Sequence, residues 1–382
     1  MIGLATPCIV NNFGTKLQAL AMQTAVRNLG HETEIINFRF KDKGNPIKSL
    51  LFCDALRYRL EGRKNAKAIA AHPEVVEGGK LISAAYNRFV EERLHLSEPC
   101  DLLSEAREIA RKYTHVVCGS DQIWLPSHIL LDFYTLNFVP EGVKRVAYAP
   151  SFGVSQVSPF MRGDYRRFLE RLDVVTARED RGVELVKELS GRDCPMVVDP
   201  TLLLTREQWD ETLNTTQYQD EAPYVFAYLL GDNPEHRRLA REFADKMGYR
   251  LVMPHLYKYS PVDEQYADEI PYGMSPEDFV ARIASAKAVF TDSFHGSVFS
   301  LLYGRELYVM ERFAKGSKGS TNSRIYSLLR LTNLTERLLT DYTLEEASAL
   351  APIQYDQVHA RLASAREESL GILRTALETP KE

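Results

Sequence analysis

A chain of 382 residues is longer than one hydrophobic core usually serves, so two domains are expected. Hydrophobic residues make up 45% of it and charged residues 26%, which is the composition of an ordinary soluble globular protein. The formal net charge of -5 argues against a dedicated nucleic-acid binder, so local basic residues must hold any anionic ligand.

The cysteines and the apolar segments narrow the class of protein further. Five cysteines are scattered without a C-x-x-C pair, which indicates neither a disulfide framework nor a zinc site, and no other metal-ligand cluster stands out. The N-terminus opens as a strand without the basic flank of a signal peptide, and no stretch reaches the ~20 apolar residues that span a bilayer. We therefore expect a cytoplasmic protein with reduced thiols.

The first half of the chain alternates short apolar runs with helix-length amphipathic segments, which is typical of a parallel α/β sheet. A helix is predicted from about Thr15 to Leu29, closed by Gly30. Six runs predict strands, at Ile2–Thr6, Thr33–Phe38, His115–Cys118, Arg145–Ala149, Val174–Ala177 and Met196–Val198.

Residues 41–100 interrupt this alternation and have a largely helical composition. Basic and apolar residues are interleaved from Lys48 to Lys67, a pattern that suits either an anionic membrane surface or a solvated helical insertion packed on the first domain. The insertion is the favoured interpretation. Peripheral association with the inner face of the membrane remains the alternative.

A second α/β series starts after Asp199-Pro200. Asn233-Pro234 supplies an N-cap and a first-turn proline for a helix, and two more helices are predicted at Pro276–Ser285 and Ser297–Tyr303. Four runs predict strands, at Tyr224–Leu230, Arg250–Met253, Ala288–Thr291 and Glu306–Met310.

These elements predict two Rossmann-like lobes with a ligand cleft between them. The first lobe covers residues 1–199 with the insertion at about 41–100 and would take the acceptor; the second covers 200–343 and would take the donor. A helical tail covers 344–382. Ligands in such sheets bind beyond the carboxyl ends of the strands, and each motif below follows a predicted strand.

Thr291-Asp292-Ser293-Phe294-His295-Gly296-Ser297 joins an apolar strand to an apolar helix. His295 would then lie at a helix N-terminus, where free backbone N–H groups favour a phosphate or carboxylate and a histidine can transfer protons. The plain alternative is that His295 only satisfies a loop carbonyl. Basic residues follow in the loop and the next helix, at Arg312, Lys315, Lys318 and Arg324, and they suggest an anion clamp without the spacing of a Walker motif.

Polar residues also follow the strands of the first lobe. Arg178 can form a bidentate contact with a carboxylate or phosphate, or pair with neighbouring acidic residues, an alternative that suits Arg181 better. Asp121 and Gln122 could hydrogen-bond sugar hydroxyls, with Trp124 as an apolar face, or Asp121 could cap a helix and Trp124 fill the core. Asn11 and Asn12 lie in a third polar turn after the first strand.

Together these segments resemble the polysaccharide pyruvyl transferase family, whose members have two lobes like GT-B glycosyltransferases. The resemblance runs from about Ile2 to Leu334 and rests on the order of seven motifs, which begin at Asn11, Gly119, Ser151, Arg178, Asp199, Asp292 and Asn322. It implies phosphoenolpyruvate as donor, with no other cofactor, and a sugar of a bacterial surface polysaccharide such as a capsule or exopolysaccharide as acceptor. Whether the acceptor is lipid-linked stays open.

The resemblance also assigns residues. His295 matches the catalytic histidine, Arg178 the donor-binding arginine and Lys315 a downstream basic residue, while better-studied branches carry an arginine where this chain has Ser293. We expect Lys315 or Arg324 to replace that arginine.

The site predicted from these motifs and the resemblance falls into three groups. The catalytic residues are His295 and the weaker candidate Asp121. The donor-binding residues are Arg178, Ser293, Phe294, Gly296, Lys315 and Arg324; the acceptor-binding residues are Asn11, Asn12 and Gln122. A GT-B nucleotide-sugar glycosyltransferase or epimerase is the alternative function, and a non-catalytic sugar-binding protein is a third.

Overall fold

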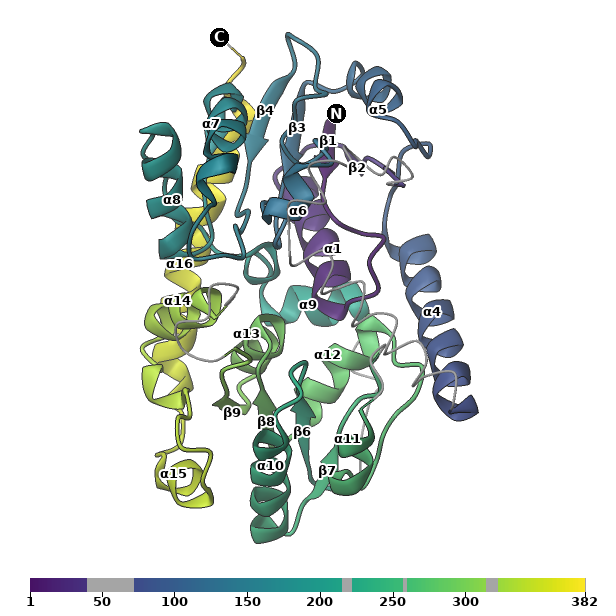
Figure 1. Ribbon diagram of the computed structural model, residues 1–382, viewed down its shortest axis with the longest axis vertical. Coiled ribbons are helices and arrows are strands. Elements are labelled where there is room, and N and C mark those ends of the chain that lie inside the picture. The colour runs from purple at the N-terminus through teal and green to yellow at the C-terminus, as the bar shows by residue number, and fades with distance from the viewer. Residues whose placement is uncertain (40–71, 215–221, 257–259, 314–321, 382) are drawn as a thin grey trace. The chain divides into compact units, whose positions relative to one another are not determined.

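The computed structural model describes residues 1–39, 72–214, 222–256, 260–313 and 322–381 (Figure 1). These residues form two units. The first combines residues 1–39, 90–203 and 364–381, and the second combines residues 72–89 with the described part of 204–363. Residues 72–89, which were expected with the first lobe, belong to the second unit. The expected tail is divided, with residues 344–363 in the second unit and residues 364–381 in the first. The basic segment Lys48 to Lys67 lies outside the described residues.

The first unit is built on a parallel five-stranded sheet in the order β2-β1-β3-β4-β5. Its strands are β1 (Ile2–Ala5), β2 (Thr33–Ile35), β3 (His115–Cys118), β4 (Lys144–Ala147) and β5 (Val174–Val175). Five of the six predicted strands are thereby confirmed. The sixth, Met196–Val198, forms only an isolated bridge to Ala177, because Pro195 and Pro200 bracket it.

Helices cover the sheet of the first unit. Helix α1 (Phe13–Asn28) begins where Asn12 accepts a hydrogen bond from the N–H of Thr15, and the chain leaves it through Gly30, whose φ of 88° suits a glycine. The other helices are α5 (Leu103–Ala110), α6 (Pro126–Ile129), α7 (Arg162–Arg171) and α8 (Asp180–Ser190), and short 3₁₀ turns lie at Pro159–Met161 and Pro200–Leu202.

The second unit repeats the plan on a parallel four-stranded sheet in the order β7-β6-β8-β9. Its strands β6 (Tyr224–Tyr228), β7 (Arg250–Val252), β8 (Ala288–Thr291) and β9 (Glu306–Val309) confirm the four predicted ones. Its helices are α9 (Arg206–Leu213), α10 (Pro234–Met247), α11 (Pro261–Tyr266), α12 (Pro276–Ser285), α13 (Phe294–Leu302), α14 (Ser323–Thr332) and α15 (Leu344–Ala349), with a 3₁₀ turn at Thr335–Arg337. Helix α13 begins three residues earlier than predicted.

Two further helices have residues in both units, α4 (Pro73–Arg93) and α16 (Tyr355–Glu378). The end of α16 is fixed to the first unit, because the buried Lys144 ammonium donates to the carbonyls of Ala376 and Thr379 at 3.0 and 2.7 Å. Ser369 also accepts a hydrogen bond from the N–H of Val198. None of the helices in the described ranges is long and apolar enough to cross a bilayer.

Each sheet has a point where the strand order reverses, between β1 and β3 in the first unit and between β6 and β8 in the second. Connections leave neighbouring strands in opposite directions there and open a crevice at their carboxyl ends, which is where ligands of such sheets bind. Each unit is therefore a Rossmann-like lobe with one preferred binding edge.

Candidate functional site

The crevice of the first unit is organised around the turn after β3. Ser120 and Asp121 leave this strand, and α1 holds both of them. The side chain of Gln18 accepts a hydrogen bond from the N–H of Ser120 at 3.0 Å, and the Thr15 hydroxyl donates to Asp121 at 2.8 Å. Asp121 has a φ of 71°, a backbone strain that such bonds offset. The structure thus places Asp121 at the reversal point of the sheet.

Arg178 lies beneath this turn with a fully buried side chain. Its Nη1 is 2.5 Å from Asp199 Oδ2, and its Nη2 is 3.4 Å from Asp121 Oδ1. Glu179 is a third carboxylate, 3.6 Å from Nε. Burial alone would lower the pKa of Arg178, but these carboxylates outweigh it, Asp199 first, and the pKa is raised. The guanidinium is thus engaged by acidic residues, and its donor-binding role stays a prediction.

Hydrogen bonds link most of the first-unit motifs into one network. The Ser120 hydroxyl donates to Asp199 at 2.9 Å, and the Ser151 hydroxyl donates to Glu179 at 2.7 Å. Asp199 also accepts the N–H and hydroxyl of Thr201. Motifs far apart in sequence are thus fixed against each other, a constraint that the residue pattern alone does not reveal.

The predicted acceptor residues surround the same edge. Asn12 caps α1, Asn11 is half-buried in the preceding loop, and the buried amide nitrogen of Gln122 has no hydrogen-bond partner among the described residues. Trp124 is fully buried and packs edge-on against Phe152, with ring centroids 5.2 Å apart. Trp124 therefore fills the core, and the suggestion that it offers a face to a sugar is wrong.

In the second unit, His295 occupies the first turn of α13 at the reversal point of the sheet. Ser293 is the N-cap and accepts a bond from the N–H of Gly296 at 3.4 Å. His295 is buried, with 6% of the residue exposed, and its ring lies edge-on to Phe294, at 5.2 Å between centroids. A side chain at Gly296 would come within 2.5 Å of the Thr291 hydroxyl, so glycine lets α13 approach β8 closely.

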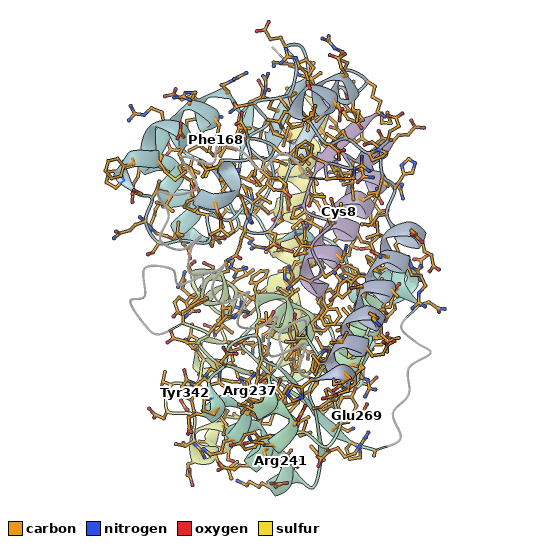
Figure 2. The ribbon with its side chains drawn as sticks, turned by 45° about the vertical axis from the view of Figure 1, so that its right-hand side comes forward. Cys8, Phe168, Arg237, Arg241, Glu269 and Tyr342 are labelled. Carbon is orange, nitrogen blue, oxygen red and sulfur yellow. The ribbon has the colours of Figure 1, made fainter. Side chains whose placement is uncertain are left out.

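Asp292 connects the ends of three strands. Its buried carboxylate accepts the N–H groups of Leu230 and Gly231, which follow β6, at 2.8 and 2.7 Å. Arg312, which follows β9, donates from Nη2 to the carbonyl oxygen of Asp292 at 3.0 Å. Arg237, labelled in Figure 2, fixes the other side of the β6 turn by donating to the Gly231 carbonyl at 2.7 Å. Asp292 therefore positions the loops around the N-terminus of α13.

Of the two cations expected to replace the family arginine, only Arg324 lies among the residues that the structure describes. The guanidinium carbon of Arg324 lies 5.9 Å from the centroid of the Phe294 ring, and its side chain is largely buried. The preceding Asn322 donates to the Phe313 carbonyl at 2.9 Å, which holds the start of α14 near the end of β9. Lys315 and Lys318 lie outside the described residues.

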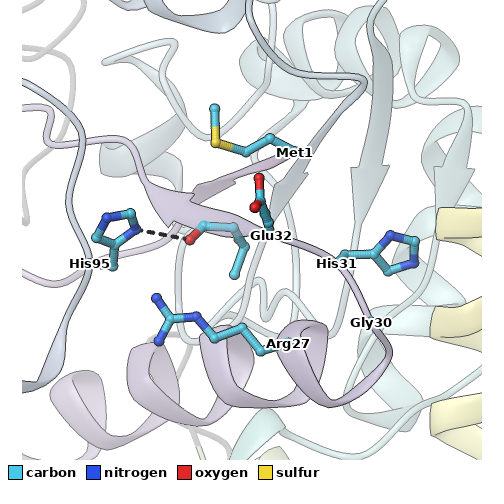
Figure 3. A pocket seen from close by; sticks show the side chains of 7 residues that line it. Met1, Arg27, Gly30, His31, Glu32 and His95 are labelled. Atoms are coloured by element: carbon cyan, nitrogen blue, oxygen red, sulfur yellow. Dashed lines mark hydrogen bonds between the residues drawn. The ribbon is translucent and has the colours of Figure 1, made fainter.

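An open depression of about 530 Å³ lies elsewhere, at the amino-terminal edge of the first sheet (Figure 3). It is lined by Arg27, His31, Glu32 and His95 with Met1, Gly30 and Thr33, and includes none of the predicted site residues. Among the described residues, no three acidic, histidine or cysteine side chains gather as a metal ion would require. The described cysteines Cys8, Cys100, Cys118 and Cys194 are buried and free, while Cys53 lies outside the described ranges.

The family model described as polysaccharide pyruvyl transferase matches residues 12–312, which cover most of the chain. The chain belongs to this family. The family consists of transferases of polysaccharide biosynthesis, and it implies a polysaccharide as the acceptor. A comparison with curated proteins finds no match.

Solved structures resemble the chain in fold. A proposed UDP-N-acetylglucosamine 2-epimerase from Listeria monocytogenes superposes with a TM-score of 0.51 at 10% identity, over 99% of this chain and 96% of that one. A glycosyltransferase from Rickettsia africae gives a TM-score of 0.48 at 12% identity, over 99% of each chain. At such identities the likeness concerns the fold alone, which is that of two Rossmann-like lobes as in GT-B enzymes.

Proposed function

We propose that this family member transfers the pyruvyl group of phosphoenolpyruvate onto two hydroxyls of a sugar, in a bacterial surface polysaccharide or its lipid-linked precursor, and releases phosphate. The observation that carries the proposal is the position of His295 on the first turn of α13, at the reversal point of the second sheet. A helix N-terminus there favours an anion, and a histidine beside it can move a proton.

The chemistry of an enol phosphate defines what the site must do. Protonation of the methylene carbon makes the adjacent carbon electrophilic, and a sugar hydroxyl attacks it. Phosphate leaves, and a second hydroxyl closes the cyclic ketal. One hydroxyl proton replaces the proton given to the methylene carbon, and the other leaves with phosphate or solvent. The site therefore needs a proton donor and cations that stabilise the departing phosphate.

Residues of the second unit supply these groups in the proposal. His295 gives the proton, and the N-terminus of α13, with Ser293, Phe294 and Gly296, faces the donor. Arg324 carries positive charge next to Phe294, at 5.9 Å from its ring. Lys315 is the further cation that the family resemblance suggests.

Residues of the first unit have the remaining proposed roles. Asp121 orients the acceptor or takes its proton, because it lies at the reversal point of the first sheet, where Thr15 and Arg178 hold its two carboxylate oxygens in position. Asn12 and Gln122 lie on the same edge and contribute polar groups for sugar hydroxyls. Arg178 keeps the donor-binding role that the resemblance assigns to it.

Thermal unfolding tests the donor without knowledge of the acceptor. The chain is heated with phosphoenolpyruvate and, separately, with phosphate, pyruvate and UDP-N-acetylglucosamine. A ligand at ~100 times its Kd stabilises the native state by about 2.7 kcal/mol, enough to raise the midpoint by a few degrees. Stabilisation by phosphoenolpyruvate above that by phosphate or pyruvate supports the proposal. Stabilisation by the nucleotide sugar alone favours the glycosyltransferase or epimerase alternative.

Substitution tests the proton donor. His295→Ala should abolish phosphate release from phosphoenolpyruvate in the presence of membrane-extracted glycan acceptors. His72→Ala is the matched control, because His72 is an exposed histidine of the same unit that pairs with Glu74. Turnover of His295→Ala near that of the control would refute the role of His295. The double variant Arg324→Ala/Lys315→Ala should lose donor affinity, and unchanged affinity would remove both cations from the proposal.

A further inference from the structure

We infer that Arg312 is the arginine that binds the anionic donor in the second unit, in place of the family arginine that is absent at Ser293. The inference rests on the proposed function and adds to it a residue that the sequence grouped only with the loop cations. Arg312 follows β9 by three residues, and β9 is the neighbour of β8, whose end leads into Ser293. Since both strands are parallel, their carboxyl ends meet at one edge of the sheet.

The contacts of Arg312 place its guanidinium beside the start of α13. Nη2 is 3.0 Å from the carbonyl oxygen of Asp292 and 3.4 Å from its Oδ1. Asp292 directly precedes Ser293, the N-cap of α13. An arginine that reaches this point from β9 therefore delivers its charge next to the position from which other members of the family extend theirs.

The guanidinium keeps hydrogen-bonding capacity after these contacts. An arginine has five N–H donors, and both hydrogen bonds of Arg312 to Asp292 use a single nitrogen, Nη2. Nε is buried and has no hydrogen-bond partner among the residues that the structure describes. The side chain is 23% exposed, so part of it is accessible to a ligand from solvent. A carboxylate or phosphate oxygen would satisfy the remaining donors.

The surroundings of Arg312 favour this role over a purely structural one. Gly231 lies against both Asp292 and Arg312, because a side chain at position 231 would come within 2.9 Å of Asp292 Oδ2 and 3.2 Å of Arg312 Cγ. The Asp292 carboxylate is already bound by two backbone N–H groups, which reduces its repulsion of an incoming anion. Arg324 is less suited, since it is more buried and its guanidinium lies over the Phe294 ring.

The test compares Arg312→Ala and Arg312→Lys with Arg330→Ala, an exposed arginine of α14 in the same unit. Isothermal titration with phosphoenolpyruvate should show a Kd raised roughly tenfold or more in Arg312→Ala, because a hydrogen bond to a charged group is worth about 1.5–3 kcal/mol. Arg312→Lys should lose less affinity for phosphoenolpyruvate than Arg312→Ala, because lysine keeps the positive charge but not the planar set of N–H donors. Arg330→Ala should bind as the unsubstituted chain does.

Two further measurements distinguish a loss of donor binding from a general disturbance of the fold in Arg312→Ala. KM for phosphoenolpyruvate should rise more than kcat falls, and added guanidinium ion at millimolar concentration should partly restore binding in Arg312→Ala. Competition by phosphate and by pyruvate, compared between Arg312→Lys and the unsubstituted chain, shows which anionic group Arg312 contacts. A folded Arg312→Ala variant with Kd and KM within about threefold of the Arg330→Ala control would overturn the inference and leave the proposed function intact. An unsubstituted chain that does not bind phosphoenolpyruvate would overturn both.

Discussion

Removal of the Arg178 guanidinium should destabilise the first unit strongly, whatever its role in binding. Its side chain and that of Asp199 are both fully buried, and Glu179 and Asp121 face the same guanidinium. In Arg178→Ala these carboxylates would remain buried without their counter-ion. Loss of one partner of a buried ion pair costs about 3–5 kcal/mol, and three carboxylates around one cation place the expected loss toward the upper end of that range.

The two tryptophans of the chain allow each unit to be followed separately. Trp124 is buried in the first unit and Trp209 in the second. In a Trp209→Phe background, the fluorescence of Trp124 therefore reports the unfolding of the first unit in urea. With an m value of about 2 kcal/mol/M, a loss of about 4 kcal/mol moves the urea midpoint down by roughly 2 M.

Arg181→Ala is the matched control for this experiment. Arg181 lies three residues further along the chain and pairs on the surface with Glu184 and Glu188 at 2.6 and 2.7 Å. Exposed pairs contribute about 0–1 kcal/mol, so the control should unfold close to the unsubstituted midpoint. If Arg178→Ala lost no more stability than Arg181→Ala, the reasoning from the buried network would be wrong.

Three other substitutions and conditions give expected outcomes. Gly119→Ala should abolish folding of the first unit, measured by circular dichroism, because the new Cβ would lie 1.8 Å from the Tyr148 carbonyl oxygen; a folded variant would contradict this. Burial lowers the pKa of His236 from 6.5 to about 4, so stability of the second unit should be full above pH 6.5 and fall by about 3 kcal/mol towards pH 4. His236→Phe should flatten that profile in urea unfolding followed by Trp209, and an unchanged slope would exclude His236 as its cause. Burial also raises the pKa of the Cys118 thiol, so alkylation followed by mass spectrometry should modify it slowly until the chain unfolds; rapid native labelling would contradict its burial.

Most of the fold follows from the sequence because its strands are short, apolar and parallel. Runs such as His115–Cys118 and Ala288–Thr291 are bounded by polar turns, so both existence and position could be predicted. Helix α13 begins before the predicted Ser297, because Ser293 already caps the helix and Phe294 lies in its first turn. Local capping decided that boundary, and hydrophobic periodicity did not reveal it.

The sequence predicts the sheet edges at which the candidate site lies, but only some of the contacts that its residues make. The rule that ligands bind at strand ends locates Asp121 and His295 without a structure. The partner of Arg178 is Asp199, 21 residues away, and the partner of Arg312 is Asp292, 20 residues away. Both pairs depend on which strands are neighbours and on how the intervening loops return, which the sequence pattern does not specify.

The discontinuous first unit has a consequence for the nascent chain. Residues 364–381 complete that unit, and they include the carbonyls that receive the Lys144 ammonium and the Ser369 hydroxyl that receives the Val198 N–H. A ribosome that has translated residue 363 has made every residue of the second unit and has not yet made the segment that completes the first. The order of maturation should therefore be reversed relative to the usual N-terminal-first order, with the C-terminal lobe completed before the lobe that holds the start of the chain.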